Sequence, residues 1–251
     1  MTKFTFLGFA SFLIHTSDGK RILIDPYLND NPASPLKSKD ITELDLLLVS
    51  HAAFDHLGDS ADIAIRTGCD VICGSDTKAV LLERGVDARQ IQETVWGLAV
   101  RGGGILVRPV ESRHRSAATL ADGRQVTALP LGFIITLADG TKIYNASDTA
   151  IFSDMKLIGE LYAPDIGLIN ATIENPFDFL PTFLTGEMTA AEAALASKWL
   201  RLKYAVACHY TVKDCPDIDE FCALLRADSS GPVPVALNPG ETWVYPPAER
   251  L

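Results

Sequence analysis

Four strand-length apolar runs in this chain each lead into a histidine or an aspartate. The runs lie at residues 44–50, 105–110, 142–147 and 203–208, and the polar residues that follow them are His51, His114, Asp148 and His209. Loops at strand ends are where a rigid sheet presents functional side chains. The chain contains only five histidines, so we expect these strand ends to converge on one metal site.

The rest of the chain follows the same pattern of short strands and helices. Residues 1–30 indicate three strands with turns at Gly8 and Asp18-Gly19, and the continuous apolar run 44–50 predicts a strand buried on both faces. Residues 61–68 and 76–85 predict helices ending at glycines, and residues 188–203 predict a helix with Thr189 as its N-cap. No linker or low-complexity segment interrupts the 251 residues, so we expect a single domain.

Composition narrows the classes of partner. The formal net charge is −10, which argues against nucleic acid, because binding phosphates needs a basic face. No apolar run approaches the roughly 20 residues that span a bilayer, and the apolar N-terminus runs into a hairpin-like turn instead of a signal-peptide cleavage site. We therefore expect a cytoplasmic protein that acts on a small molecule without a membrane partner, and the sequence leaves a homo-oligomer open.

The cysteines do not indicate a disulfide framework. Five cysteines at irregular spacing are an odd number, and paired CxxC motifs are absent. Cys208 and Cys215 bracket His209, but we expect buried thiols there and not metal ligands.

Residues 50–59 form the densest group of candidate ligands. The segment SHAAFDHLGD places His51, Asp55 and His56 within six residues, as a tight turn between a buried strand and a helix would require. Imidazole and carboxylate groups are good ligands for zinc or manganese. The alternative is structural, with Asp55 capping a helix and His56 merely exposed.

This segment resembles the His-x-His-x-Asp-His motif of the metallo-β-lactamase superfamily. Further pieces match in order, and they are ILIDPYL (22–28), His114, SDTAIFSDMKLIGE (147–160), GEMTAAEAA (186–194), ACHY (207–210) and LNPGE (237–241). The match is sharpest to the simple metal-dependent hydrolases similar to L-ascorbate-6-phosphate lactonase. The resemblance implies an α+β fold, a four-layer αββα sandwich spanning residues 1–251.

The resemblance also implies two metal positions that share one aspartate. The first would use His51, His114 and Asp148. The second would use Asp55, His56, Asp148 and His209. Asp148 would bridge the two.

The sequence departs from the family pattern at two places. Ala53 stands where the motif has its second histidine, and Phe9 stands where the first-strand motif Leu-Gly-His has its histidine. Because Ala53 has no donor atom, we expect one tightly bound zinc or manganese ion per chain, with a second, weaker ion as the alternative. Three protein ligands plus water remain a competent catalytic arrangement.

The chemistry that we expect is hydrolysis by a metal-activated water. Asp55 is the candidate to orient this water or take its proton, and Tyr210 is the candidate donor to an oxyanion or leaving group. An ordinary strand-end tyrosine is the equal alternative for Tyr210.

The segment 173–187 is the candidate substrate wall. It carries Phe177 and Phe179, which would line an apolar pocket or anchor a satellite core, and Asn170 just before it would add a polar contact. No Arg or Lys occurs between Lys156 and Lys198, which disfavours a phosphorylated substrate unless Arg113 or Arg115 supplies the charge. We expect a small cyclic ester or cyclic amide.

Two other functions stay open at this point. One is a phosphodiesterase of the same fold. The other is a metal-binding or sensory protein without turnover, which Ala53 motivates.

Overall fold

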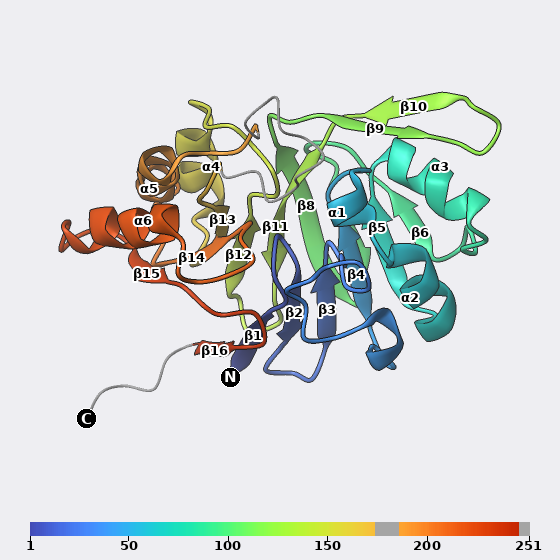
Figure 1. The fold of residues 1–251 in the computed structure, drawn as a ribbon, viewed down its shortest axis with the longest axis horizontal. Helices are drawn as coiled ribbons and strands as arrows, with labels where there is room; N and C mark the ends of the chain where they lie inside the picture. Colours follow the sequence, from blue (N-terminus) through green and yellow to red (C-terminus); the bar gives the residue numbers. More distant parts are fainter. Residues whose placement is uncertain (174–185, 246–251) are drawn as a thin grey trace.

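The computed structural model describes residues 1–173 and 186–245, in which two seven-stranded β-sheets pack face to face (Figure 1). The first sheet has the order β16-β1-β2-β3-β4-β5-β6. Its strands are Thr2–Phe6 (β1), Phe12–His15 (β2), Arg21–Ile24 (β3), Leu46–Val49 (β4), Asp70–Cys73 (β5), Ile91–Glu93 (β6) and Thr242–Tyr245 (β16).

The second sheet has the order β15-β14-β13-β12-β11-β8-β7. Its strands are Val100–Gly102 (β7), Ile105–Glu111 (β8), Leu131–Thr136 (β11), Lys142–Asn145 (β12), Ile166–Asn170 (β13), Tyr204–Cys208 (β14) and Val233–Val235 (β15).

Both sheets follow the same plan of one parallel half and one antiparallel half. Strands β3 to β6 run parallel in the first sheet, as do β12 to β15 in the second. The remaining neighbours pair antiparallel. Parallel strands need crossover connections, which are commonly helices that cover the sheet.

Strand β4 shows why the continuous apolar runs form buried strands. All four of its side chains are buried. Leu46 and Leu48 lie in the core between the two sheets, whereas Leu47 and Val49 lie in a second core on the outer side of the first sheet. Alternate side chains of a strand point to opposite faces, so a strand between two cores must be apolar throughout.

Helices cover the outer face of each sheet, which completes four layers (Figure 1). The helices over the first sheet are Phe54–Leu57 (α1), Ser60–Thr67 (α2) and Ser75–Glu83 (α3). Those over the second sheet are Met155–Tyr162 (α4), Ala190–Trp199 (α5) and Pro216–Arg226 (α6), and one short 3₁₀ helix spans Ser38–Asp40. The α+β sandwich expected from the sequence is confirmed.

Two helix ends lie where the sequence placed them. The Thr189 hydroxyl accepts a hydrogen bond from the Glu192 amide at 3.3 Å, which caps α5. Gly68 ends α2 in the left-handed conformation at φ +69°.

A two-stranded hairpin lies outside both sheets. It consists of Ser116–Thr119 (β9) and Gln125–Ala128 (β10), and it packs against α3 (Figure 1). The hairpin begins two residues after His114, and its first residue, Ser116, accepts a hydrogen bond from the Ala52 amide at 3.1 Å.

Within the described residues, none of the helices combines the length and the apolar character needed to cross a membrane.

Candidate metal centre

The parallel strands of both sheets deliver polar side chains to one rim of the sandwich. Strand β3 ends just before Asp25, β4 ends two residues before His51, β12 ends three residues before Asp148, and β14 ends just before His209. The carboxyl ends of strands are the usual place for ligand sites in parallel sheets. His114 reaches the same rim from the loop after β8.

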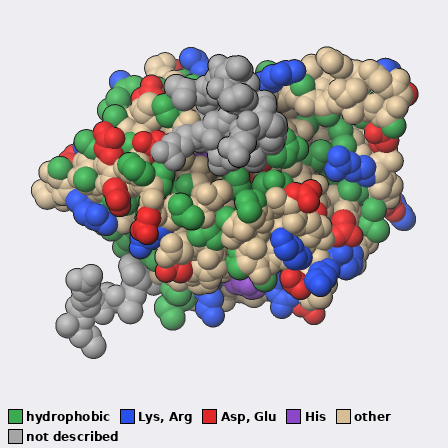
Figure 2. Space-filling view, viewed as in Figure 1, with side chains coloured by type: hydrophobic (Ala, Val, Ile, Leu, Met, Phe, Trp, Pro, Cys, Tyr) green, Lys and Arg blue, Asp and Glu red, His purple; other side chains and the backbone are tan. Residues whose placement is uncertain are grey.

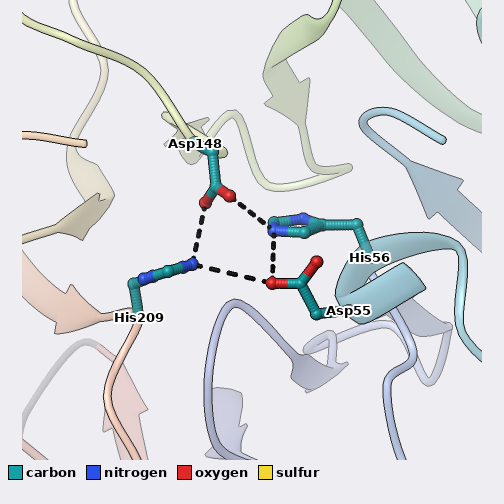
Figure 3. Close-up of side chains that lie close together, drawn as sticks. All are labelled: Asp55, His56, Asp148 and His209. Atoms are coloured by element: carbon teal, nitrogen blue, oxygen red, sulfur yellow. Dashed lines mark hydrogen bonds and ion pairs between the residues drawn. The ribbon is translucent and has the colours of Figure 1, made fainter. Parts of the chain in front are cut away.

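A compact buried cluster at this rim consists of Asp55, His56, Asp148 and His209 (Figure 3). Asp148 is central, because its Oδ2 lies 2.9 Å from His56 Nε2 and its Oδ1 lies 3.4 Å from His209 Nε2. Asp55 Oδ2 lies 3.9 Å from each of the same two nitrogens. One donor atom from each residue lies within 4.8 Å of the others, so a single ion could contact all four.

A second set of three side chains shares Asp148 with the first. His51 Nε2 lies 3.9 Å and His114 Nε2 lies 4.0 Å from Asp148 Oδ2. The side chain of His51 is fully buried, whereas that of His114 is 22% exposed. The structure thus brings together all six residues that the sequence placed around a cation, in the two expected groups.

The hydrogen bonding of this cluster is incomplete in a way that suits a cation. Among the described residues, His51 Nε2, His209 Nε2 and Asp148 Oδ1 are buried and have no hydrogen-bond partner. Leaving such atoms unsatisfied costs free energy. A divalent metal would accept these lone pairs, and a mixture of imidazole and carboxylate donors suits zinc or manganese.

The cluster is strongly coupled electrostatically. Burial lowers the pKa of His209, but the carboxylates of Asp148, Glu187 and Asp55 together outweigh it and raise that pKa to about 9. The pKa of His56 is likewise raised well above its usual value, because Asp148 and Asp25 together outweigh its burial. In turn His209 and His56 hold the pKa of Asp148 well below its usual value despite burial. A bound metal would replace the protons that these histidines retain.

Asp25 supports the cluster from behind, and sequence reasoning did not assign it to the site. Its Oδ2 accepts hydrogen bonds from His56 Nδ1 at 2.9 Å and from the Ser50 hydroxyl at 2.8 Å. The Ser50 amide donates to Asp25 Oδ1 at 2.8 Å. Such carboxylate–histidine pairs orient metal ligands in many sites. The segment ILIDPYL, which contains Asp25, was among the pieces that match the family, but that match alone assigned no role to Asp25.

The same network fixes the tautomers of two ligands. Because Ser50 gives its only hydroxyl proton to Asp25, its oxygen must accept from His51 Nδ1, 3.0 Å away. His56 Nδ1 likewise donates to Asp25. Both imidazoles therefore carry a proton on Nδ1, away from the centre. This leaves Nε2 as the nitrogen that would bind a metal, with the proton that His56 shares with Asp148 displaced.

Backbone strain gathers around this rim. Six non-glycine residues in the described chain have positive φ, and four of them lie in or beside the site: Phe9, Asp25, Ser147 and His209. Left-handed conformations cost free energy in residues with a side chain and cluster at functional sites. The surrounding hydrogen bonds therefore hold these residues where their side chains are needed.

Ala53 lies in the sequence between His51 of one ligand set and Asp55 of the other, and it contributes no donor atom. It is the N-cap residue of α1, with φ −64° and ψ 149°. Asp55 does not cap a helix, and His56 is fully buried, so the structural alternative for this segment is wrong.

Tyr210 and Asn170 are placed less favourably for the roles suggested from the sequence. The Tyr210 hydroxyl donates to the Leu237 carbonyl at 2.7 Å and accepts from the Leu237 amide at 3.0 Å. This geometry supports the structural alternative for Tyr210. Asn170 is fully buried at the end of β13, and its Nδ2 donates to the Thr149 carbonyl at 3.2 Å.

Phe177 and Phe179, the candidate substrate contacts, lie outside the described residues. All five cysteines are buried and none forms a disulfide, and neither ligand set among the described residues contains one.

Comparison with known proteins places this centre in a family. Residues 20–210 match the family described as the Beta-lactamase superfamily domain. The chain is similar to a UPF0173 metal-dependent hydrolase of Archaeoglobus fulgidus, with 33% identity over 97% of this chain and 99% of the relative. A UPF0173 metal-dependent hydrolase of Thermococcus kodakarensis shares 35% identity over 96% of this chain and 98% of the relative.

A solved structure agrees with these sequence relatives. The metallo hydrolase Igni18 from Ignicoccus hospitalis is similar at a TM-score of 0.76 and 29% identity, over 97% of this chain and 98% of Igni18. The matching region contains all six residues of the two ligand sets. The chain belongs to the β-lactamase superfamily, among the UPF0173 metal-dependent hydrolases, and is a metal-dependent hydrolase.

Proposed function

We propose that this hydrolase opens a small cyclic ester or cyclic amide that carries no phosphate group. The observation that carries hydrolysis is the convergence of two ligand sets on Asp148, one fully buried and one nearly so. The narrower resemblance to sugar-phosphate lactonases supports a cyclic substrate, and the charge around the site argues against the phosphate.

The proposed cofactor is one tightly bound zinc or manganese ion in the four-residue set. Asp55, His56, Asp148 and His209 offer four buried donors, whereas the other set offers three because Ala53 has no donor atom. Fewer ligands weaken binding, so a second ion would be held less tightly. When bound, the metal would lower the pKa of a water molecule toward about 7 and polarise the scissile carbonyl.

The protein side chains would position the reacting groups. Asp25 and Ser50 keep His51 in the tautomer whose Nε2 accepts a hydrogen bond. This nitrogen, beside Asp148, can hold the attacking water by one of its protons. Asp55, 7% exposed at the same centre, is assigned the orientation of that water as well. We assign no step to Tyr210, because its hydroxyl is held by the Leu237 backbone.

The cations near the site give little support for a phosphate group. Arg113 donates to Glu111 Oε1 at 2.9 Å, and its guanidinium lies 5.1 Å from the centre of the Phe152 ring. An arginine already paired and packed in this way is poorly placed to bind substrate. Lysine and arginine side chains are also interspersed with acidic and apolar ones on the face in Figure 2, and with the net charge of −10 this disfavours nucleic acid as substrate.

One observation favours a second candidate, the hydrolysis of a small phosphodiester. Arg115 is exposed next to His114, and among the described residues it has no ion-pair partner. A free guanidinium beside the metal centre could bind a phosphate oxygen.

A substrate panel separates the two candidates. We expect the metal-loaded protein to hydrolyse members of a lactone and lactam panel and to leave bis-p-nitrophenyl phosphate intact. Asp148→Ala should lose metal and activity together, whereas the exposed surface variant Asp87→Ala should keep both. Turnover of the phosphodiester alone would support the second candidate. Full activity in Asp148→Ala would contradict the proposed metal-dependent hydrolysis by this centre.

A further inference from the structure

We infer that Phe9 is a positioning residue that holds the metal ligand His209 by packing, in place of a hydrogen bond. The inference rests on the proposed metal site and concerns how this chain keeps one ligand in place. It starts from a contrast among the buried histidines. His51 and His56 each have Nδ1 within hydrogen-bond distance of Ser50 or Asp25, whereas His209 Nδ1 is buried without a partner in the described residues.

This contrast matters because the imidazole ring of a metal-binding histidine needs a neighbouring group that fixes its orientation. A histidine that binds metal through Nε2 carries its proton on Nδ1, and that proton is normally given to an acceptor that fixes the ring. Here His209 turns Nε2 toward Asp148 and Asp55, so its unpartnered Nδ1 cannot fix the ring. Something else must limit the rotation of the imidazole.

Phe9 is placed to do so. Its ring stands at 90° to the His209 ring, with 6.0 Å between the centroids. Phe9 is itself only 1% exposed, and the Tyr27 ring packs against it edge to face at 5.4 Å. A fixed aromatic ring packed edge to face is a favourable neighbour for another ring.

The backbones of the two residues are joined as well. The His209 amide donates to the Phe9 carbonyl at 2.7 Å, and the Phe9 amide donates to the Tyr210 carbonyl at 2.9 Å. Phe9 has φ +53° and His209 has φ +71°. Phe9 lies between β1 and β2 of the first sheet, and His209 follows β14 of the second. These hydrogen bonds therefore let Phe9, which belongs to the first sheet, fix the backbone position of His209, which follows a strand of the second sheet.

Metal affinity measures this role separately from stability. Phe9→Leu removes the aromatic ring but keeps an apolar side chain without a branch at Cβ. Phe12→Leu is the matched control, because Phe12 is fully buried and packs against the Phe6 ring at 5.1 Å. Both variants should lower the melting temperature through lost core packing.

Titration of the metal-free proteins with Zn²⁺ and with Mn²⁺ gives the decisive comparison. We expect Phe9→Leu to weaken binding by about 10-fold or more, as loss of a supporting contact does at other metal sites, and Phe12→Leu to bind like the wild type. Phe9→His, which can accept the Nδ1 proton of His209, should bind more tightly than Phe9→Leu.

The outcomes distinguish this inference from the proposed function. If the wild type binds neither metal, the proposed function fails and the inference fails with it. If the wild type binds metal and Phe9→Leu binds equally well, only the positioning role of Phe9 is overturned. Equal weakening in Phe9→Leu and Phe12→Leu, or no gain in Phe9→His over Phe9→Leu, overturns it too.

Discussion

Asp25 accepts a hydrogen bond from Nδ1 of His56 at 2.9 Å, on the side of the imidazole opposite the Asp148 carboxylate. The two carboxylates thus hold the ring from both nitrogens, and Asp25 belongs to the centre although the sequence analysis did not place it there. Its left-handed backbone conformation, φ +46°, is one that asparagine also tolerates. This makes a conservative test possible.

Asp25→Asn should weaken metal binding by about 10- to 100-fold while the fold is kept. The amide that replaces one carboxylate oxygen donates hydrogen bonds, so it opposes the proton on His56 Nδ1. Isothermal titration of the metal-free protein measures the change. Asp45→Asn serves as the control, because Asp45 accepts from the Arg21 amide at 2.9 Å, away from the metal centre. Unchanged affinity in Asp25→Asn would show that its hydrogen bonds do not support the ligand.

Ala53→His should raise the metal content from about one ion per chain to about two, because it adds a donor beside the three-residue set. The extended backbone at this position, φ −64° and ψ 149°, suits histidine as well as alanine. Ala53→Leu adds bulk without a donor atom and should stay near one ion. Metal analysis of the purified variants gives the answer, and a wild type that already holds two tight ions would contradict the expectation.

Acidity should affect the metal-free and the metal-loaded protein differently. The folded-state pKa of His209 is raised to about 9, above the unfolded value of about 6.5. Its contribution to folding stability is therefore complete below about pH 6.5 and is lost as the pH rises through about 9. His56, whose pKa is also raised, adds to the same trend.

The melting temperature of the metal-free protein should accordingly fall between about pH 7 and about pH 9. Metal binding should strengthen over the same interval, because fewer protons compete for His56 and His209. Thermal unfolding with and without metal across this interval measures both effects. Parallel curves for the two forms would show that these histidines do not exchange protons for metal.

Thr189→Ala should destabilise the fold by about 1 kcal/mol, because it removes the side-chain half of the capping box at the start of α5. Urea unfolding measures this loss. Thr189 belongs to neither ligand set, so metal affinity should not change, and a large drop in affinity would point to a role beyond capping.

Much of the sandwich could be predicted from local sequence. The apolar runs of β4 and β13 are buried at every position. A strand that is buried on both faces appears in the sequence as a continuous apolar run, which can be recognised without knowing which strands pair with it. The short strands β6 and β7 and the hairpin β9–β10 were not predicted. Strands of three or four residues with exposed positions exist through pairing with distant partners, which local patterns do not record. Helices α4 and α6 were missed too.

The six ligands of the centre could be proposed because their residue types are rare and follow strands. The supporting role of Asp25 could not be proposed from the sequence, because it depends on a hydrogen bond with His56, which lies 31 residues further along the chain. Tyr210, for which the sequence left two equal alternatives, shows that a neighbour in sequence need not share a site: it adjoins His209, yet its hydroxyl donates to the Leu237 carbonyl.

The division of the ligands between the sheets has a mechanical consequence. His51, Asp55 and His56 come from the connections of the first sheet, whereas His114, Asp148 and His209 come from those of the second. An ion bound among them would join the two sheets directly, in addition to the apolar core between them and the backbone hydrogen bonds of Phe9 with His209 and Tyr210. A shift of one sheet relative to the other would separate the ligands. Metal binding therefore depends on the correct packing of the two sheets.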